Sequence, residues 1–362
     1  MTARNPALRF AGFCLAVAAL ATPALAPSAL AEVHQGEMAP TKIAFGNGGG
    51  GPTGVQIVND FHIIHRDGFK GAPKRIAISV FNVAFPNQKF QSAETKRTSS
   101  WVALNALGTA MQNTLSEKKS AAQHTQLEGI DSATRQRITD AAYADFVAQL
   151  TAAGYEVISA ADLAALTPEY ATWTAQPNFS AGRYGTYVAP TGRKLYFLRS
   201  DTAKADSQGN LNKVAASFQG FDSPQAFQRS PYLAHDGKIG VIAVTLVVDY
   251  GTYVNTGNTK KFNAKMDVSF TPGVTAQSGN FYDTATLLDY WGPNSGGFPA
   301  VAALAAPLTS DQAFGTVDDG GNGEGEVAMK ADPALFEKAA TEVTQAANNH
   351  LVATFAAAAA AK

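Results

Sequence analysis

Cysteine is almost absent from this chain, since Cys14 is the one cysteine among 362 residues. It lies inside an apolar run that continues past it, and Leu15 follows it where the signal of a lipoprotein would have small residues. The rest of the chain therefore has no disulfide and no thiolate chemistry. Its stability must come from a hydrophobic core, and a chain of this length can bury one.

Charge of one sign and long apolar runs are also lacking. The formal net charge is −1, and 16% of the residues are charged, without the basic stripe that nucleic-acid-binding proteins carry. After residue 31 no apolar run approaches the roughly 20 residues of a transmembrane helix. We therefore expect no nucleic-acid partner and no transmembrane helix in the mature chain.

The N-terminal residues follow the order of a secretory signal. Arg4 and Arg9 supply positive charge, residues 10–21 are apolar, and residues 23–31 are rich in small side chains. This order predicts a signal peptide over 1–31 with cleavage near Ala31, and hence a periplasmic or secreted protein. Loss of the two arginines lowers the net charge to about −3, which favours solubility without steering the protein to a partner.

Glycine is concentrated in one segment, which predicts a flexible N-terminal arm over 32–72. Gly49, Gly51 and Gly54 match the dinucleotide-binding pattern Gly-x-Gly-x-x-Gly. That pattern requires a strand before it and a helix after it, and neither is evident here. The glycines therefore indicate a loop, and we expect no nucleotide cofactor.

Hydrophobic periodicity predicts one α/β (α+β) domain over 73–355, with a mixed β-sheet flanked by helices and long loop insertions. Residues 74–85 have the composition of a buried strand, and residues 132–153 carry an apolar stripe at helical spacing. A strand over 155–158 and a short helix capped by Ser159 follow.

The C-terminal half indicates more strands and a closing helix. Residues 239–271 predict an antiparallel hairpin that Pro272-Gly273 closes, and a final helix begins near Asp332-Pro333. An alanine-rich tail over 356–362 is expected to be a fraying helical end. A helix over 101–115 and a strand over 194–199 are weaker predictions, and loop insertions are expected near 167–237 and 279–327.

His62, His65 and Asp67 have the composition of a metal site, because they place two imidazoles and a carboxylate close together. A zinc site needs three or four ligands that converge. On a helix the two histidines would share a face, whereas on a strand they would point to opposite faces. Partly exposed structural histidines are the simpler interpretation.

A second candidate metal site lies in a glycine-rich segment with Asp318, Asp319, Glu324 and Glu326. In the register of a calcium-binding EF-hand loop, positions three and twelve would be glycine and methionine, so two oxygen ligands are missing. Calcium in another geometry is the one cofactor that this composition indicates. A solvated loop is the alternative.

No residue stands out as catalytic. The chain has no Gly-x-Ser-x-Gly elbow and no His-Glu-x-x-His zinc motif. A triad assembled only in three dimensions would leave no such motif. An enzyme, either a secreted hydrolase or a metal-dependent one, would have to build its site on the loops at 172–237 and 279–327.

The order of elements resembles known periplasmic domains. A strand over 76–85 is followed by a helix that ends at Gly154, the strand segment Tyr155-Glu-Val-Ile158 and a small helix over 161–166. This series resembles the periplasmic domain of curli-secretion (CsgG-like) lipoproteins, and also the TolB N-terminal and penicillin-binding-protein-activator domains. About half of the chain is covered, and the insertions at 167–237 and 279–327 have no counterpart.

The resemblance implies a non-enzymatic module that binds envelope or secreted proteins or envelope polymers, without catalytic residues to transfer. Two alternatives stay open beside it. One is the secreted enzyme with a loop-built site. The other is a subunit of a surface assembly, in which the arm at 32–54 adds a strand to the sheet of a neighbouring copy.

Overall fold

The computed structural model describes residues 33–35, 56–58, 61–95, 119–182, 185–198, 225–255, 268–278, 286–295, 297–318 and 325–361. All of them belong to the unit Ala31–Lys362. The predicted signal peptide, Cys14, the glycine pattern at 49–54 and the helix predicted over 101–115 lie outside the described residues. None of the described helices is both long enough and apolar enough to cross a membrane.

The predicted fold class is confirmed: the described residues form mixed β-sheets flanked by helices. The larger sheet has twelve described strands: β1 (Val33–Gln35), β2 (Gln56–Val58), β3 (Phe61–Ile64), β4 (Arg75–Phe85), β7 (Glu156–Ile158), β8 (Ser180–Gly182), β9 (Gly185–Val188), β10 (Gly240–Asn255), β11 (Val268–Ala276), β12 (Leu287–Trp291), β13 (Ala300–Leu304) and β14 (Leu308–Ser310). The smaller sheet has four: β5 (Gln88–Thr95), β6 (Lys119–Glu128), β15 (Gly315–Asp318) and β16 (Gly325–Ala331).

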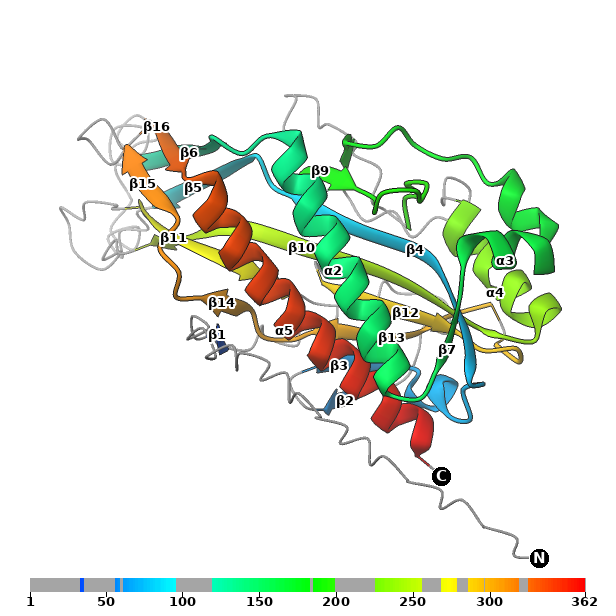
Figure 1. Ribbon diagram of the computed structural model, residues 1–362. Helices are drawn as coiled ribbons and strands as arrows, with labels where there is room; N and C mark the ends of the chain where they lie inside the picture. Colours follow the sequence, from blue (N-terminus) through cyan, green and yellow to red (C-terminus); the bar gives the residue numbers. More distant parts are fainter. Residues whose placement is uncertain are drawn as a thin grey trace, which may run out of the picture. The chain divides into compact units, whose positions relative to one another are not determined.

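The centre of the larger sheet is the parallel pair β4 and β10 (Figure 1). Both strands are rich in β-branched and other apolar residues, and ten of the eleven residues of β4 are buried. The second half of β10 pairs with β11, so the predicted hairpin is confirmed. Its predicted end is wrong, because β11 continues through Pro272 and Gly273 to Ala276. Pro272 faces Gly251 at a register shift, a place where a strand tolerates proline.

Helices α2 (Ser132–Ala152) and α5 (Pro333–Ala360) lie side by side across one face of this sheet (Figure 1). The predicted stripe of α2 is confirmed, since Ile138, Ala142, Phe146 and Leu150 are all fully buried. In α5 the first buried residue is Phe336, whereas Leu335 is 40% exposed. The alanine run that was expected to fray is the last part of α5, which continues to Ala360, and Ala358 is buried. We call the surface that these helices cover the α2/α5 face.

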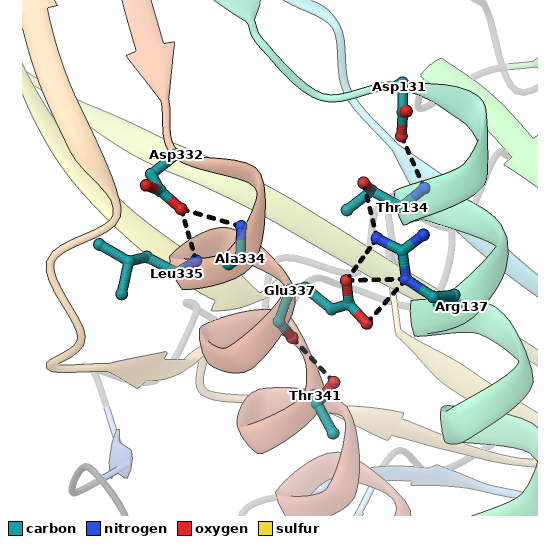
Figure 2. Close-up of polar contacts among 8 residues, drawn as sticks. All are labelled: Asp131, Thr134, Arg137, Asp332, Ala334, Leu335, Glu337 and Thr341. Carbon is teal, nitrogen blue, oxygen red and sulfur yellow. Dashed lines mark hydrogen bonds and ion pairs between the residues drawn. The ribbon is translucent and has the colours of Figure 1, made fainter.

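Both of these helices begin at an aspartate cap, and Figure 2 shows the two caps near each other. Asp131 accepts a hydrogen bond from the backbone N–H of Thr134 at 2.7 Å, and Asp332 accepts two, at 2.9 and 3.0 Å. The guanidinium of Arg137 then joins the helices by donating to both carboxylate oxygens of Glu337, at 2.7 to 3.1 Å. This pair links the two helices near their starts.

The opposite face of the larger sheet, here called the α3/α4 face, is covered by α3 (Ala160–Leu166), the 3-10 helix Pro168–Thr172, residues 195–198 and α4 (Gln225–Gly237). The predicted cap of α3 is confirmed, because Ser159 accepts a bond from the N–H of Asp162 at 3.1 Å. The strand predicted over 194–199 is wrong within the described residues, where Leu195 makes only an isolated bridge to Gln176.

Two segments expected to be loops contain regular structure, which corrects those predictions. Residues 279–327 hold β12, β13, β14 and β15, and every residue of β12 and β13 is buried. Residues 167–237 hold β8, β9 and α4. The arm predicted over 32–72 supplies β1, β2, β3 and a 3-10 helix, and β1 and β2 are the outermost strands at the two ends of the main strand order.

Candidate binding site

The first candidate metal group is divided between a strand and the turn after it. His62 lies on β3, whose backbone pairs with β2 and β13. His65 follows at a positive φ of 52°, and its side chain is exposed. Asp67 forms an ion pair with Lys70 at 2.8 Å, and this bond holds the pKa of Asp67 below its usual value.

The second candidate group is also divided. Asp318 pairs with Lys330 at 2.9 Å, and Glu326 lies 3.6 Å from Nδ1 of His124. Asp319 and Glu324 lie outside the described residues. Among the side chains that the structure describes, no group of three or more His, Cys, Asp or Glu lies close enough together to hold a metal ion. Calcium binding here stays a prediction.

Polar side chains gather instead on the α3/α4 face of the larger sheet. Asn82 of β4 is in register with Thr245 of β10. On β12, Asp289 is in register with Ala243, two residues before Thr245. Because side chains alternate between the faces of a sheet, and Ala243 packs beneath α3 and α4, all three polar residues point to this face. Each is at most 2% exposed.

This polar cluster includes atoms without hydrogen-bond partners. Asn82 donates through Nδ2 to the carbonyl of Tyr196 at 2.7 Å, but its Oδ1 has no partner among the described residues. The same holds there for Oγ1 of Thr245 and for the indole nitrogens of Trp173 and Trp291. Each buried polar atom left without a bond costs about 1–3 kcal/mol, and native proteins keep few of them. Bound water or a ligand would remove that cost.

Aromatic rings cover the cluster from the outside. The ring of Trp173 lies 5.0 Å from that of Tyr170 and 5.5 Å from that of Tyr196. The hydroxyl of Tyr170 donates to the carbonyl of Ser79 at 2.9 Å. Burial, and then the neighbouring Tyr170, raises the pKa of Tyr196 to about 12, so this phenol is neutral at physiological pH.

A second polar cluster joins the two sheets. Nζ of Lys89, on β5, lies 2.6 Å from Oδ2 of Asp249, on β10, and Asp249 is 1% exposed. Gln277 also donates to this carboxylate, and Oδ1 accepts the N–H of Tyr250 at 2.7 Å. The hydroxyl of Tyr250 then donates to the carbonyl of Thr125, on β6, at 2.8 Å. These bonds join β5 and β6 to β10, so the role of these polar groups is to hold the smaller sheet against β10.

The outer strand of the smaller sheet is a different kind of site. In the described part of the chain β15 pairs with β16 alone, and all four of its residues are exposed, including Val317 at 37%. An edge strand presents unpaired N–H and C=O groups that another strand can pair with. The neighbouring strand is well anchored, since Val327 and Met329 of β16 are buried and β16 runs parallel to β6.

The sequence patterns did not predict the polar cluster on the α3/α4 face or the open edge of β15. Asn82 and Thr245 are visible as single polar residues inside apolar strands, which is the signal that could have marked them. Their meeting depends on the parallel register of β4 and β10, which no local pattern specifies. The open edge was hidden because β15 lies in a segment expected to be a loop.

No protein-family model matches this chain, and no curated protein or solved structure is significantly similar to it. A function must therefore be drawn from two features, the open edge of β15 and the polar cluster on the α3/α4 face.

Proposed function

We propose that this chain is an exported, non-enzymatic binding module of the cell envelope or of a secretion system, and that it captures an extended segment of a partner protein along β15. The observation that carries the proposal is the exposed outer edge of β15, which is paired on one side only among the described residues. Adding a strand to such an edge supplies affinity through backbone hydrogen bonds.

Two further features support this proposal. Exposed edges are commonly protected by proline, by lysine or by a covering segment, and β15 contains neither residue. The N-terminal residues predict export, and the order of elements through α2, β7 and α3 resembles periplasmic domains that bind other proteins. Val317 offers an exposed apolar side chain that a partner strand would cover.

Site-specific photo-crosslinking in cells tests the proposal. A photoreactive residue at Val317 should capture a defined envelope protein, whereas one at Leu335, equally exposed but on α5, should not. Binding of the purified partner should weaken at least tenfold in Val317→Pro, which removes a backbone N–H, and hold in Val317→Thr. Capture from neither position, or unchanged affinity in Val317→Pro, would refute it.

A second candidate function is a subunit of a surface assembly, and the position of β1 favours it. β1 adds to the edge of β14, with Val33 in register with Ser310, and Val33 packs against the main core. The 20 residues between β1 and β2 span at most about 70 Å of extended chain, so β1 has the reach to pair in a neighbouring copy instead.

A disulfide between register partners distinguishes these arrangements. Val33→Cys and Ser310→Cys place two cysteines across the β1–β14 pair in a mature chain without others. Directly opposed strand residues lie about 4.5–5.5 Å apart at Cα, within the range that a disulfide spans. Disulfide-linked dimers or larger species on a non-reducing gel would support strand exchange. Crosslinked monomers alone would contradict it.

A further inference from the structure

The two faces of the larger sheet differ in a way that packing alone does not require. On the α2/α5 face the two central strands present large apolar side chains, among them Phe81 and Leu246. On the α3/α4 face the same two strands and their neighbours present apolar side chains such as Val80, Val241 and Trp291. Among these lie three buried polar residues, Asn82, Thr245 and Asp289, and the small residues Ala77, Ala243 and Ala303. A face built only to hold helices has no need of buried polar atoms that lack hydrogen bonds.

Ala243 stands at the centre of this small and polar region. Its register partners are Val80 on β4 and Asp289 on β12, and Thr245 is the next residue of β10 on the same face. Thr245 is in turn beside Asn82. Ala243 therefore has Val80 and Asp289 directly beside it, with the hydroxyl of Thr245 and the amide of Asn82 one position further along the two central strands.

The unpartnered atoms around this centre include both donors and acceptors. Oδ1 of Asn82 can only accept a hydrogen bond, and the indole nitrogens of Trp173 and Trp291 can only donate. The hydroxyl of Thr245 can do either. A hydroxyl group is the simplest chemical partner that satisfies both kinds.

We propose that the α3/α4 face holds a binding site, centred over Ala243, for a small neutral polyhydroxylated molecule. The unpartnered groups of Asn82, Thr245 and the two indoles are all uncharged, so they match a neutral ligand. The neighbouring aromatic rings of Trp173 and Tyr196 give the C–H groups of a polyol an apolar surface to pack on. This site is separate from the edge of β15 and does not depend on the partner proposed there.

Entry to the site requires part of its cover to move, because Trp173 and Trp291 are 3% and 0% exposed. α4 presents both polar and large apolar side chains to this region: the buried Ser230 lies 3.5 Å from Ser79, and the ring of Phe227 lies 5.8 Å from that of Trp291. Binding should therefore be slow compared with diffusion, and it should change the surroundings of both indoles.

Tryptophan fluorescence of the mature chain tests the proposal. The chain has three tryptophans, and replacing Trp101 with phenylalanine leaves the two at the site. The probes are glycerol and D-glucose as neutral polyols, with D-glucose 6-phosphate as a charged analogue. We expect a saturable fluorescence change with at least one neutral polyol and at least tenfold weaker binding of the phosphate.

Thr245→Val is the decisive variant, because it keeps the shape of the side chain and removes only the hydroxyl. It should fold at least as stably as the parent, because it removes a buried hydroxyl that has no hydrogen bond in the free protein. It should also bind the polyol at least tenfold more weakly. Thr275→Val is the matched control, because the buried Thr275 bonds to Thr309 at 3.1 Å, outside the site. The proposal is overturned if neither neutral polyol saturates, if the phosphate binds equally well, or if Thr245→Val binds like the parent.

Discussion

Replacing Lys89 with methionine would leave the carboxylate of Asp249 buried without its cation. Lys89 has 18% of its side chain exposed and Asp249 has 1%, so water screens this ion pair poorly. Methionine is similar in length to lysine and keeps the apolar contacts of the stem. The variant therefore removes mainly the ammonium group at 2.6 Å from Oδ2.

Breaking a buried ion pair on one side costs about 3–5 kcal/mol, because the remaining charge is desolvated and uncompensated. Asp249 keeps the bonds from Gln277 and from the N–H of Tyr250, which places the expected loss near the lower limit. We expect the free energy of unfolding of Lys89→Met to fall by about 3 kcal/mol, which corresponds to a fall in Tm of roughly 4 °C for a chain of this length.

Urea unfolding of four proteins measures this coupling: the parent, Lys89→Met, Asp249→Asn and the double variant. The double variant should lose less than the sum of the single losses, with a coupling of about 1–3 kcal/mol, because no isolated charge remains in it. A loss below about 1 kcal/mol in Lys89→Met would show that the pair behaves like an exposed one. Such a result would refute the claim that this ion pair holds the smaller sheet against β10.

Three other predictions concern the starts of the two long helices. Gly129→Ala should lower the free energy of unfolding by about 2 kcal/mol or more in urea, because Gly129 has a φ of +88° and a Cβ there would lie 2.5 Å from the carbonyl oxygen of Ala331; an unchanged midpoint would contradict the tight β6–β16 contact. Glu337→Gln should cost less than about 1 kcal/mol and lose its effect at high salt, because the ion pair with Arg137 is largely exposed; a large loss that salt does not reduce would argue against this. The hydrogen bonds from Thr134 lower the pKa of Asp131 from 3.8, so its stabilisation is present above that pH and is lost as the pH falls through the lower folded value. Asp131→Ser keeps a helix cap that does not titrate. Between about pH 5 and about pH 2, the free energy of unfolding of this variant should therefore fall less than that of the parent.

Local patterns were enough for some elements. The stripe of Ile138, Ala142, Phe146 and Leu150 repeats every four residues, so it identified α2 without knowledge of its partner. Ser159 marked the start of α3 because the capping bond is made within one turn, and Pro333 marked the start of α5 because proline suits the first turn of a helix. The strand at 75–85 was recognisable because β-branched residues dominate it.

Other elements depend on residues far away in the chain. β12 and β13 are five residues each, inside a segment rich in glycine and proline, and pairing with β10 and with β3 is what makes them strands. The same reason hid the polar cluster, since Asn82 and Thr245 are 163 residues apart and meet only through the parallel register. Of the metal candidates, Asp67 and Asp318 each form an ion pair with a lysine, and Glu326 lies beside the imidazole of His124.

Amide hydrogen exchange of β15 tests the proposed binding function most directly. In the free protein, the N–H groups of Gly315–Asp318 that face away from β16 should exchange rapidly, because among the described residues this edge has no strand beside it. With the partner captured at Val317 bound, these amides should slow at least tenfold, while those of α5 stay unchanged. Binding that leaves the exchange of β15 unaltered would contradict the claim that the partner adds a strand there.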